Sequence, residues 1–342
     1  TAWWHGCGWQ WAQRFWCWQR PQRGARSYDR VMRFAKMHGL GNDYVYVDGS
    51  AEHISDAPAL ARWLSDRHVG VGSDGLIIIT QPDDADADVR MRMYNADGSE
   101  GMMCGNGIRC VAKFAVDRGL SQSNPLRVDT RRGVLSVRWL RGADGTVAAA
   151  TVDMGPPILA CQRIPAVVPG VAPDSVVVKQ AVPAGFWSGC SAPAGWETAC
   201  GLAQDYTLVS MGNPHIVLWV TDVSKVPLDT VGPHVERHAW FPQRINVHLV
   251  QRLSSGEVRM RTWERGSGAT MACGTGASAV CVAGVLTGRT TSPLLAHLPG
   301  GDLTLEWAGG EAPVFMTGPA VEVFEGELHL GARPAEVAHG AH

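Results

Sequence analysis

The sequence contains no uninterrupted apolar run of the roughly 18 residues that a membrane-spanning helix requires. It also lacks an excess of charge of one sign, since 30 lysines and arginines face 32 aspartates and glutamates and leave a net charge of -2. Proteins that bind nucleic acid or an anionic membrane surface usually carry a concentrated basic surface. We therefore expect neither a nucleic acid nor a membrane as a partner.

The cysteines do not follow the pattern of a disulfide-rich or zinc-binding protein. There are nine of them, an odd number, and they are scattered along 342 residues without a Cys-x-x-Cys pair. Such usage in a large chain is typical of a reducing compartment. We expect a cytoplasmic protein without a metal site.

Composition and length indicate a globular enzyme of two domains. Hydrophobic residues make up 45% of the chain and charged residues 18%, which is ordinary for a protein with a sizeable core. We place the domains at residues 32–148 and 149–330, followed by a tail at 331–342. Residues 1–31 lack hydrophobic periodicity, hold six tryptophans and carry five arginines against the single acid Asp29. We interpret them as an extension outside the domains and expect them to be disordered.

Two stretches far apart in the sequence share nearly the same pattern. Cys104 precedes the run Gly-Asn-Gly, and Cys273 precedes the run Gly-Thr-Gly. Each run leads into a segment that reads as a helix, 108–116 in the first case and 277–286 in the second. A thiol at a helix N-terminus lies beside unpaired N–H groups and the positive end of the helix dipole, which favours the thiolate. We expect both cysteines to have a lowered pKa and to act on one small anionic substrate.

The segments around each cysteine run repeat one plan, in which strands precede the cysteine and its helix and further strands follow. The first set of expected strands comprises 32–37, 44–48, 76–80, 89–94, 126–130, 134–140 and 147–154, with a helix at 58–67. The second set comprises 207–210, 216–220, 246–251, 258–263, 303–307 and 321–330. The stretch 156–205 is rich in Pro, Ala and Gly and reads as loops with short strands.

This repetition predicts an α/β (α+β) fold of two homologous domains. Each domain is expected to be a curved, mostly antiparallel sheet wrapped around a central helix, because both helices are apolar nearly all round. The last strand is free to return to the first domain. The duplication would place the two cysteines opposite each other, with the active site in the inter-domain cleft.

Two thiols on opposite sides of a carbon can invert it. One removes a proton as thiolate and the other delivers a proton to the opposite face as thiol, which suits racemisation or epimerisation of an amino acid. The paired helix N-termini could stabilise the charge that develops on the substrate carboxylate without a cofactor.

Other candidate groups have plainer interpretations. Cys110 and Cys281 lie inside the helices and are expected to be packing residues, while the cysteines in irregular segments are expected to be incidental. His234 and His238 have metal-helix spacing, but Val235 follows where a metalloprotease carries glutamate, so we interpret both as surface histidines. The glycine-rich loop 70–75 is a weak nucleotide-binding signal, because no crossover helix follows it.

Seven segments taken together resemble the diaminopimelate epimerase family over about residues 32–330. They are 36–44 (KMHGLGNDY), 94–100 (YNADGSE), 103–110 (MCGNGIRC), 212–215 (GNPH), 246–247 (NV), 264–268 (ERGSG) and 272–277 (ACGTGA). The resemblance implies an isomerase without cofactors that interconverts LL- and meso-2,6-diaminopimelate in lysine and peptidoglycan precursor biosynthesis. Members are often dimers, and a homodimer is an option that the sequence leaves open.

The resemblance also implies roles for individual residues. Cys104 and Cys273 are then the catalytic acid/base pair, and His215 and Glu264 tune their pKa values. The substrate-binding positions implied are Asn42, Asn95, Gly105, Asn106, Asn213, Asn246, Glu264, Arg265, Gly274 and Thr275. Two positions depart from the family pattern: Gly75 stands where glutamine is frequent, and Ala269 where glutamate is frequent.

Three other interpretations remain. A proline or hydroxyproline racemase shares the fold, but typically has histidine where Asn106 stands. The phenazine-biosynthesis isomerase type lacks the paired cysteines. A catalytically inactive, amino-acid-binding relative is disfavoured by the intact cysteines.

Overall fold

The computed structural model describes residues 31–330 of the chain. The N-terminal extension, which we expected to be disordered, lies outside the described residues except for Val31, the first residue of a strand. The tail at 331–342 also lies outside them. Residues Arg33–Leu328 form one compact unit. Within residues 31–330, no helix is long and apolar enough to cross a membrane.

The first half of the unit contains two helices, α1 (Ala57–Ser65) and α2 (Gly105–Asp117). Its strands are β1 (Val31–Gly39), β2 (Asn42–Asp48), β3 (Gly75–Thr80), β4 (Val89–Asn95), β5 (Leu126–Thr130), β6 (Gly133–Arg141) and β7 (Val147–Asp153). The sequence predicted all of these elements to within a few residues. Asp56 is the N-cap of α1, because its side chain accepts a hydrogen bond from the Ala59 N–H at 2.9 Å.

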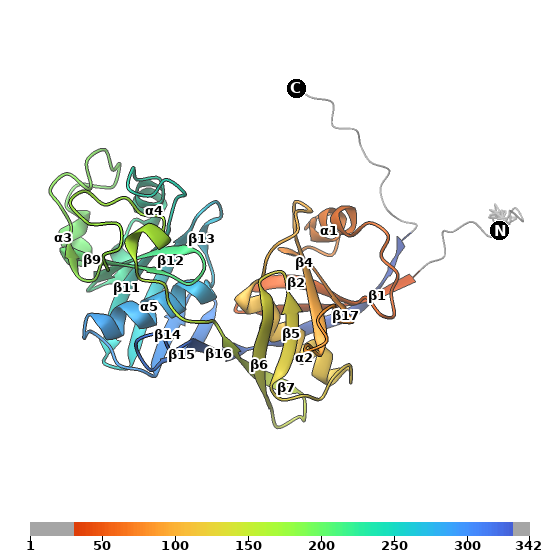
Figure 1. Ribbon diagram of the computed structural model, residues 1–342. Coiled ribbons are helices and arrows are strands. Elements are labelled where there is room, and N and C mark those ends of the chain that lie inside the picture. Colours follow the sequence, from red (N-terminus) through yellow and green to blue (C-terminus); the bar gives the residue numbers. More distant parts are fainter. Residues whose placement is uncertain (1–30, 331–342) are drawn as a thin grey trace, which may run out of the picture. The chain divides into compact units, whose positions relative to one another are not determined.

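The second half contains α3 (Trp196–Cys200), α4 (Leu228–Glu236) and α5 (Gly274–Leu286), with short 3-10 turns at Cys161–Arg163 and Val223–Lys225. Its strands are β8 (Gln180–Ala181), β9 (Asp205–Ser210), β10 (Pro214–Val220), β11 (Asn246–Ser254), β12 (Glu257–Glu264), β13 (Gly268–Thr270), β14 (Leu294–Leu298), β15 (Gly301–Trp307) and β16 (Val314–Pro319). The last strand, β17 (Val321–His329), pairs with β1. In Figure 1 it is the blue strand among the red and orange ones.

The two halves have the same sheet topology. From β1 to β7, successive strands pair antiparallel, parallel, antiparallel, parallel, antiparallel and antiparallel. The series β9, β10, β11, β12, β14, β15 and β16 follows the same alternation. The parallel crossovers carry α1 and α2 in the first half and α4 and α5 in the second. This correspondence confirms the duplicated, mostly antiparallel α/β architecture.

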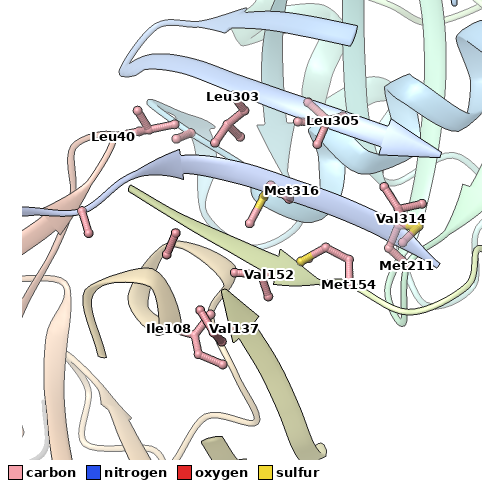
Figure 2. Close-up of a cluster of buried hydrophobic side chains, with 14 of the residues drawn as sticks. Leu40, Ile108, Val137, Val152, Met154, Met211, Leu303, Leu305, Val314 and Met316 are labelled. Atoms are coloured by element: carbon pink, nitrogen blue, oxygen red, sulfur yellow. The ribbon is translucent and has the colours of Figure 1, made fainter. Parts of the chain in front are cut away.

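The last strands of the two repeats pair with each other. β7 runs antiparallel to β16, with Val152 opposite Met316 and Asp153 opposite Phe315, so the strands of both halves join in one continuous sheet. Figure 2 shows the apolar side chains around this junction, including Met154 and Met316 above Ile108 of α2. These residues belong to one core cluster fed by both halves. The division expected after residue 148 falls inside β7, which is paired with both β6 and β16.

Both central helices end in the same way. Gly119 after α2 and Gly288 after α5 adopt positive φ values of 73° and 66°. The N–H groups of these glycines and of the residues after them donate to carbonyls of the last helical turn, which is the Schellman pattern.

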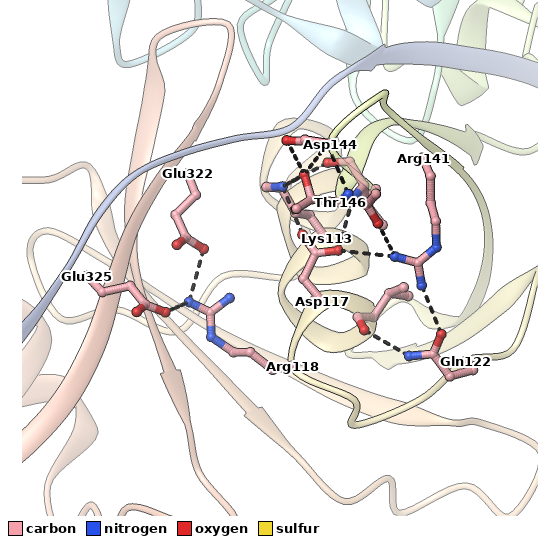
Figure 3. A network of polar contacts seen from close by, with 12 residues as sticks. Lys113, Asp117, Arg118, Gln122, Arg141, Asp144, Thr146, Glu322 and Glu325 are labelled. Atoms are coloured by element: carbon pink, nitrogen blue, oxygen red, sulfur yellow. Dashed lines mark hydrogen bonds and ion pairs between the residues drawn. The ribbon is translucent and has the colours of Figure 1, made fainter.

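The side chain of Lys113 in α2 donates to Asp117 at 2.8 Å and to the Val147 carbonyl at 2.9 Å, as part of the polar network in Figure 3.

Five helices and strands were not predicted: α3, α4, β13, β14 and β16. α4 contains Gly232 and Pro233, which usually break helices, yet its glycine lets Trp263 pack directly against the backbone. β14 has the sequence LLAHL without β-branched residues, and β16 ends in Gly318 and Pro319. The sequences of these elements have only a weak local preference for helix or strand, so packing against the rest of the protein stabilises them.

Candidate functional site

Cys104 and Cys273 are the N-cap residues of α2 and α5. The starts of these helices meet, because the Asn106 side-chain amide donates to the Ala272 carbonyl at 3.4 Å. The expected pairing of the two cysteine runs at the ends of the central helices is therefore present. Gly105 and Asn106 form the first turn of α2, and Gly274 and Thr275 form the first turn of α5, each following its cysteine.

Met316 of β16 lies directly against both helix starts. A Cβ added to Gly274 would lie 2.8 Å from the Met316 sulfur, and a Cβ added to Gly105 would lie 3.2 Å from its terminal methyl. Arg109 of α2 is fully buried and donates to the Gly105 carbonyl and to the Pro319 carbonyl, both at 3.1 Å. Glycine after each cysteine thus allows the junction strand to pack beneath the site.

The Cys104 thiol has one partner on each side. Its sulfur accepts from the Gly107 N–H at 3.4 Å and donates to the Asn42 side-chain oxygen at 3.2 Å. Asn42 is oriented in turn by Asp74, whose carboxylate accepts from the Asn42 amide at 2.8 Å. The glycine-rich loop 70–75 therefore supplies Asp74 as a support for Asn42.

The Cys273 thiol lies between a hydroxyl and a carboxylate. Its sulfur is 3.6 Å from the Thr275 hydroxyl oxygen, and Glu264 at the end of β12 is a further hydrogen-bond partner. Thr270 fixes that carboxylate by donating to it at 2.6 Å. The charge of Glu264 also contributes to raising the pKa of Cys104, after burial.

The expected lowering of the two thiol pKa values is wrong for this structure. Burial raises the pKa of Cys104, and the N–H groups of Gly107 and Asn106 lower it without overcoming burial. Burial and then the charge of Glu264 raise the pKa of Cys273 well above its ordinary value, against the hydroxyl of Thr275. The hydrogen-bond donors at the helix ends lower the thiol pKa values as expected. The free-energy cost of removing a thiolate from water is larger than the stabilisation that these donors provide.

The residues Asn213 and His215 connect to the Cys273 side of the site. The Asn213 amide donates to Thr275 at 3.3 Å, and the Asn213 oxygen lies 2.9 Å from Nε2 of His215. His215 is fully buried, and burial, followed by the charge of a neighbouring histidine, lowers its pKa well below the ordinary value. The ring is therefore neutral and reaches Cys273 through two intervening side chains.

A braced turn carries Glu264 and Arg265. The Asn246 oxygen accepts from the Arg265 N–H at 3.0 Å, while the Asn246 amide donates to the Pro214 carbonyl at 2.9 Å. The buried Glu236 of α4 accepts from the Gly266 N–H at 3.0 Å. The Arg265 guanidinium is exposed and donates to the Gln243 carbonyl at 3.1 Å.

Asn95 occupies the place in the first half that Glu264 occupies in the second. It ends β4 opposite Gly75, as Glu264 ends β12 next to Asn246, and its amide donates to Ser99 at 2.9 Å. A Cβ on Gly75 would lie 2.1 Å from the Tyr94 carbonyl oxygen. A side chain at position 75 would collide with this carbonyl, so the backbone at this position fits glycine.

The remaining candidates lie outside this arrangement. Cys110 and Cys281 are completely buried in the core, as expected, and burial raises the pKa of Cys110 to about 11. His234 and His238 are not surface histidines: they are half-buried against the ring of Phe186, and His234 bonds the Phe186 carbonyl at 2.9 Å. In the described part of the chain, no group of three or more His, Cys, Asp or Glu residues could hold a metal ion.

Sequence reasoning missed three supporting residues: Asp74, Glu236 and Thr270. Each contacts a candidate residue rather than forming part of a motif. Only the position of Asp74, inside a glycine-rich loop, offered a signal in the sequence.

Comparison with known proteins gives consistent results. The model of the family described as diaminopimelate epimerase matches residues 34–160 and 207–323. The diaminopimelate epimerase of Moorella thermoacetica is 45% identical over 300 residues, covering 87% of this chain and 100% of that protein. The diaminopimelate epimerase of Desulfovibrio desulfuricans is 46% identical over 300 residues, covering 88% and 99%.

Solved structures show the same fold at lower identity. A phenazine biosynthesis protein of the PhzF family from Bacillus anthracis has a TM-score of 0.59 and 16% identity, with 87% of this chain and 99% of that chain covered. At this identity the likeness concerns the fold alone.

Proposed function

The chain belongs to the diaminopimelate epimerase family, and from this premise we propose that it interconverts LL- and meso-2,6-diaminopimelate by exchanging a proton between two thiols. It is then an isomerase of lysine and peptidoglycan precursor biosynthesis. The observation that carries the proposal is the pair of cysteines that cap two helices whose first turns meet. The family's other enzyme neighbours share the fold, but no contact in this structure favours them.

Inversion follows from two thiols on opposite faces of the substrate α-carbon. One cysteine, as thiolate, takes the α-proton, and the electron pair moves into the adjacent carboxylate. The other cysteine gives its proton to the opposite face, so the protein carries the same number of protons before and after the step. The N–H groups at the first turns of α2 and α5 stabilise the enediolate-like charge.

The raised thiol pKa values fit a site that ionises only when substrate is bound. Burial raises the pKa of Glu264 as well, and Cys273 is its hydrogen-bond partner. When Glu264 takes up a proton, its charge no longer opposes the Cys273 thiolate. Closure of residues 32–148 against 149–330 would further exclude water from the reacting groups.

The carboxylates and ammonium groups of the substrate require binding residues of opposite kinds. Arg265 and the amide groups of Asn42, Asn95, Asn213 and Asn246 suit carboxylates, whereas Glu264 and the amide oxygens suit ammonium groups. The proposal includes a cytoplasmic location, where the thiols stay reduced, and leaves a homodimer as an option.

The test is the reaction of LL-diaminopimelate with reduced enzyme in deuterated water. We expect conversion to the meso isomer, with one deuterium at the inverted α-carbon, detected by chiral chromatography and mass spectrometry. Proline and hydroxyproline are tested alongside. Conversion of either in place of diaminopimelate would assign the racemase activity instead, and binding without exchange would indicate an inactive relative.

A further inference from the structure

His248 lies at the buried end of a chain of side chains that leads to Cys273. It belongs to β11 and has no exposed surface. Its Nε2 is 2.9 Å from Nδ1 of His215, and its Nδ1 is 3.0 Å from the Thr262 hydroxyl. Both ring nitrogens are therefore engaged inside the protein, on the side of His215 away from the cysteine.

Five contacts join Thr262 to the sulfur of Cys273. In order, they connect Thr262 to His248, His248 to His215, His215 to Asn213, Asn213 to Thr275 and Thr275 to Cys273. We name this series the Thr262–Cys273 chain. Thr262 and both histidines are buried, so water does not compete for these bonds.

The hydrogen bonds of the Thr262–Cys273 chain all run in one direction. Asn213 points its oxygen at His215 and its amide at Thr275, so Nε2 of His215 must carry the hydrogen. Burial lowers the pKa of both histidines, to about 3 for His248, and the rings are neutral. Nδ1 of His215 is then bare and accepts from Nε2–H of His248, whose own Nδ1 accepts from the Thr262 hydroxyl.

At the other end, this direction decides what Thr275 does. Its hydroxyl oxygen accepts the Asn213 amide hydrogen, which leaves the hydroxyl hydrogen free for the Cys273 sulfur. The charged groups that face the chain are Glu264, beside the sulfur, and Arg265, near His215. Every donor therefore points toward Cys273.

We propose that His248 and Thr262 are positioning residues that set this direction and so hold a hydrogen-bond donor on Cys273. The role rests on the proposed function, in which Cys273 is one of the two acid/base groups. A donor on the sulfur stabilises the thiolate, and it opposes the effect of Glu264 on the same atom. His248 itself does not touch the reacting groups.

Only one of the two cysteines has such a chain. By strand register, Ile77 of β3 corresponds to His248, and Met93 of β4 corresponds to Thr262. Both residues of the first half are apolar and cannot relay a hydrogen bond. Cys104 instead donates its own hydrogen to Asn42. Both thiols have a side-chain oxygen to which they donate, Asn42 for Cys104 and Glu264 for Cys273, but only Cys273 also lies against the side-chain hydroxyl that ends such a chain.

The packing against the two helices supports this correspondence. A Cβ on Gly276 of α5 would lie 2.2 Å from Cε1 of His248, and a Cβ on Gly107 of α2 would lie 2.9 Å from Cδ1 of Ile77. Equivalent glycines therefore face equivalent side chains, and the His248 ring is pressed against the first turn of the helix that Cys273 caps.

The first test compares Thr262→Val with Thr262→Ser. Valine keeps the shape of threonine but cannot donate, so Nδ1 of His248 loses the donor that fixes its tautomer and the rest of the Thr262–Cys273 chain is free to reverse. Thr275 then donates to Asn213 and leaves Cys273. Serine keeps the donor and should behave like the natural protein.

The readout is the rate of iodoacetamide alkylation of each cysteine as a function of pH, measured by peptide mass spectrometry without substrate. In Thr262→Val we expect the pKa of Cys273 to rise by about one unit, which lowers its alkylation at neutral pH about tenfold. Cys104 in the same molecules is the internal reference and should not change. Equal shifts of both cysteines, or none at Cys273, would overturn the proposal.

A second pair of variants tests His248 directly. His248→Gln keeps an amide donor near the position of Nε2, whereas His248→Leu leaves Nδ1 of His215 without a donor. We expect slowed Cys273 alkylation only in the leucine variant, and nitrogen NMR of the natural protein should show Nε2–H tautomers for both histidines. An Nδ1–H tautomer at either ring would contradict the stated direction. If the natural protein epimerises diaminopimelate but the variants show no shift at Cys273, only the role of the Thr262–Cys273 chain is refuted. If the variants show the shifts but the natural protein is inactive, only the proposed function is refuted.

Discussion

At the scale of single residues, burial and hydrogen bonding from backbone N–H groups shift the thiol pKa values of Cys104 and Cys273 in opposite directions. Both thiols lie at helix N-termini, where backbone N–H groups favour the thiolate, yet burial raises both pKa values. A sequence shows the first effect through the Cys-Gly-x-Gly spacing. It does not show the second, because the degree of burial depends on strands that arrive from elsewhere in the chain.

Replacing either cysteine by serine should abolish most of the activity. A serine hydroxyl is a far weaker acid than a thiol, and inversion needs one base and one acid on opposite faces. We expect kcat to fall by about 10²–10⁴-fold in Cys104→Ser and likewise in Cys273→Ser, measured as conversion of LL-diaminopimelate.

The buried Cys281 offers a matched control, because it lies in α5 but belongs to the core. Cys281→Ser should lower the free energy of unfolding while leaving kcat of the folded protein within a few-fold of normal. Near-normal turnover in either Cys104→Ser or Cys273→Ser would contradict the two-thiol mechanism.

At the scale of elements, the starts of α2 and α5 differ in what they pack against. A Cβ on Gly276 would press on the rigid ring of His248, whereas a Cβ on Gly107 would meet the mobile end of Ile77. We therefore expect Gly276→Ala to lower the free energy of unfolding by about 1–3 kcal/mol, and Gly107→Ala to cost less. Urea denaturation of the two variants measures the difference.

The same comparison has a second readout. Gly276→Ala should displace the His248 ring and slow alkylation of Cys273, while Gly107→Ala should not affect Cys273. If the two variants lost equal stability, the packing of His248 against α5 would not be tighter than that of Ile77 against α2.

The elements also show how far sequence reasoning reaches. Both central helices and most strands were predictable, because their glycine punctuation and apolar patterns are local. α4 was missed because Gly232 and Pro233 contradict a helix, although Gly232 is what lets Trp263 pack against it. β16 was missed for a similar reason, and it proves to be the strand that joins the two repeats.

The candidate site divides in the same way. The residues in motifs were predictable through their family resemblance, and the helix starts do bring Cys104 and Cys273 into one region. Supporting residues such as Asp74, Glu236 and His248 act through contacts between distant strands. Apart from the glycine-rich loop around Asp74, one sequence contains no signal for such contacts, because a lone histidine or glutamate has many plainer explanations.

At the scale of the whole molecule, the junction of β7 and β16 is the structural link between the repeats. Met316 is fully buried there, against the starts of both central helices. We expect Met316→Ala to lower the free energy of unfolding by about 2–5 kcal/mol, because it leaves a cavity beneath the site. Met102→Ala removes an exposed methionine and serves as the control, with an expected change within about 0.5 kcal/mol.

The buried histidines also make the stability of the whole molecule depend on pH. Burial lowers the folded-state pKa of His248 from 6.5 to about 3, so the unfolded chain binds a proton between these values and the folded chain does not. The stability that this neutral ring contributes is complete above about pH 6.5 and is lost as the pH falls through that window. His248→Gln cannot titrate, so its loss of unfolding free energy between pH 7 and pH 5 should be smaller by about 2 kcal/mol.

His297 provides a comparison of opposite sign. Its hydrogen bonds to Glu257 and Asp302 raise its pKa in the folded protein. Its contribution is complete below the unfolded-state pKa and is lost as the pH rises through the folded-state pKa, so His297→Gln should lose more stability at pH 5 than at pH 7. Urea denaturation at both pH values separates the cases. If His248→Gln followed the pH dependence of the natural protein, the His248 ring would have to gain its proton in the folded state, and its Nδ1 could no longer accept from the Thr262 hydroxyl.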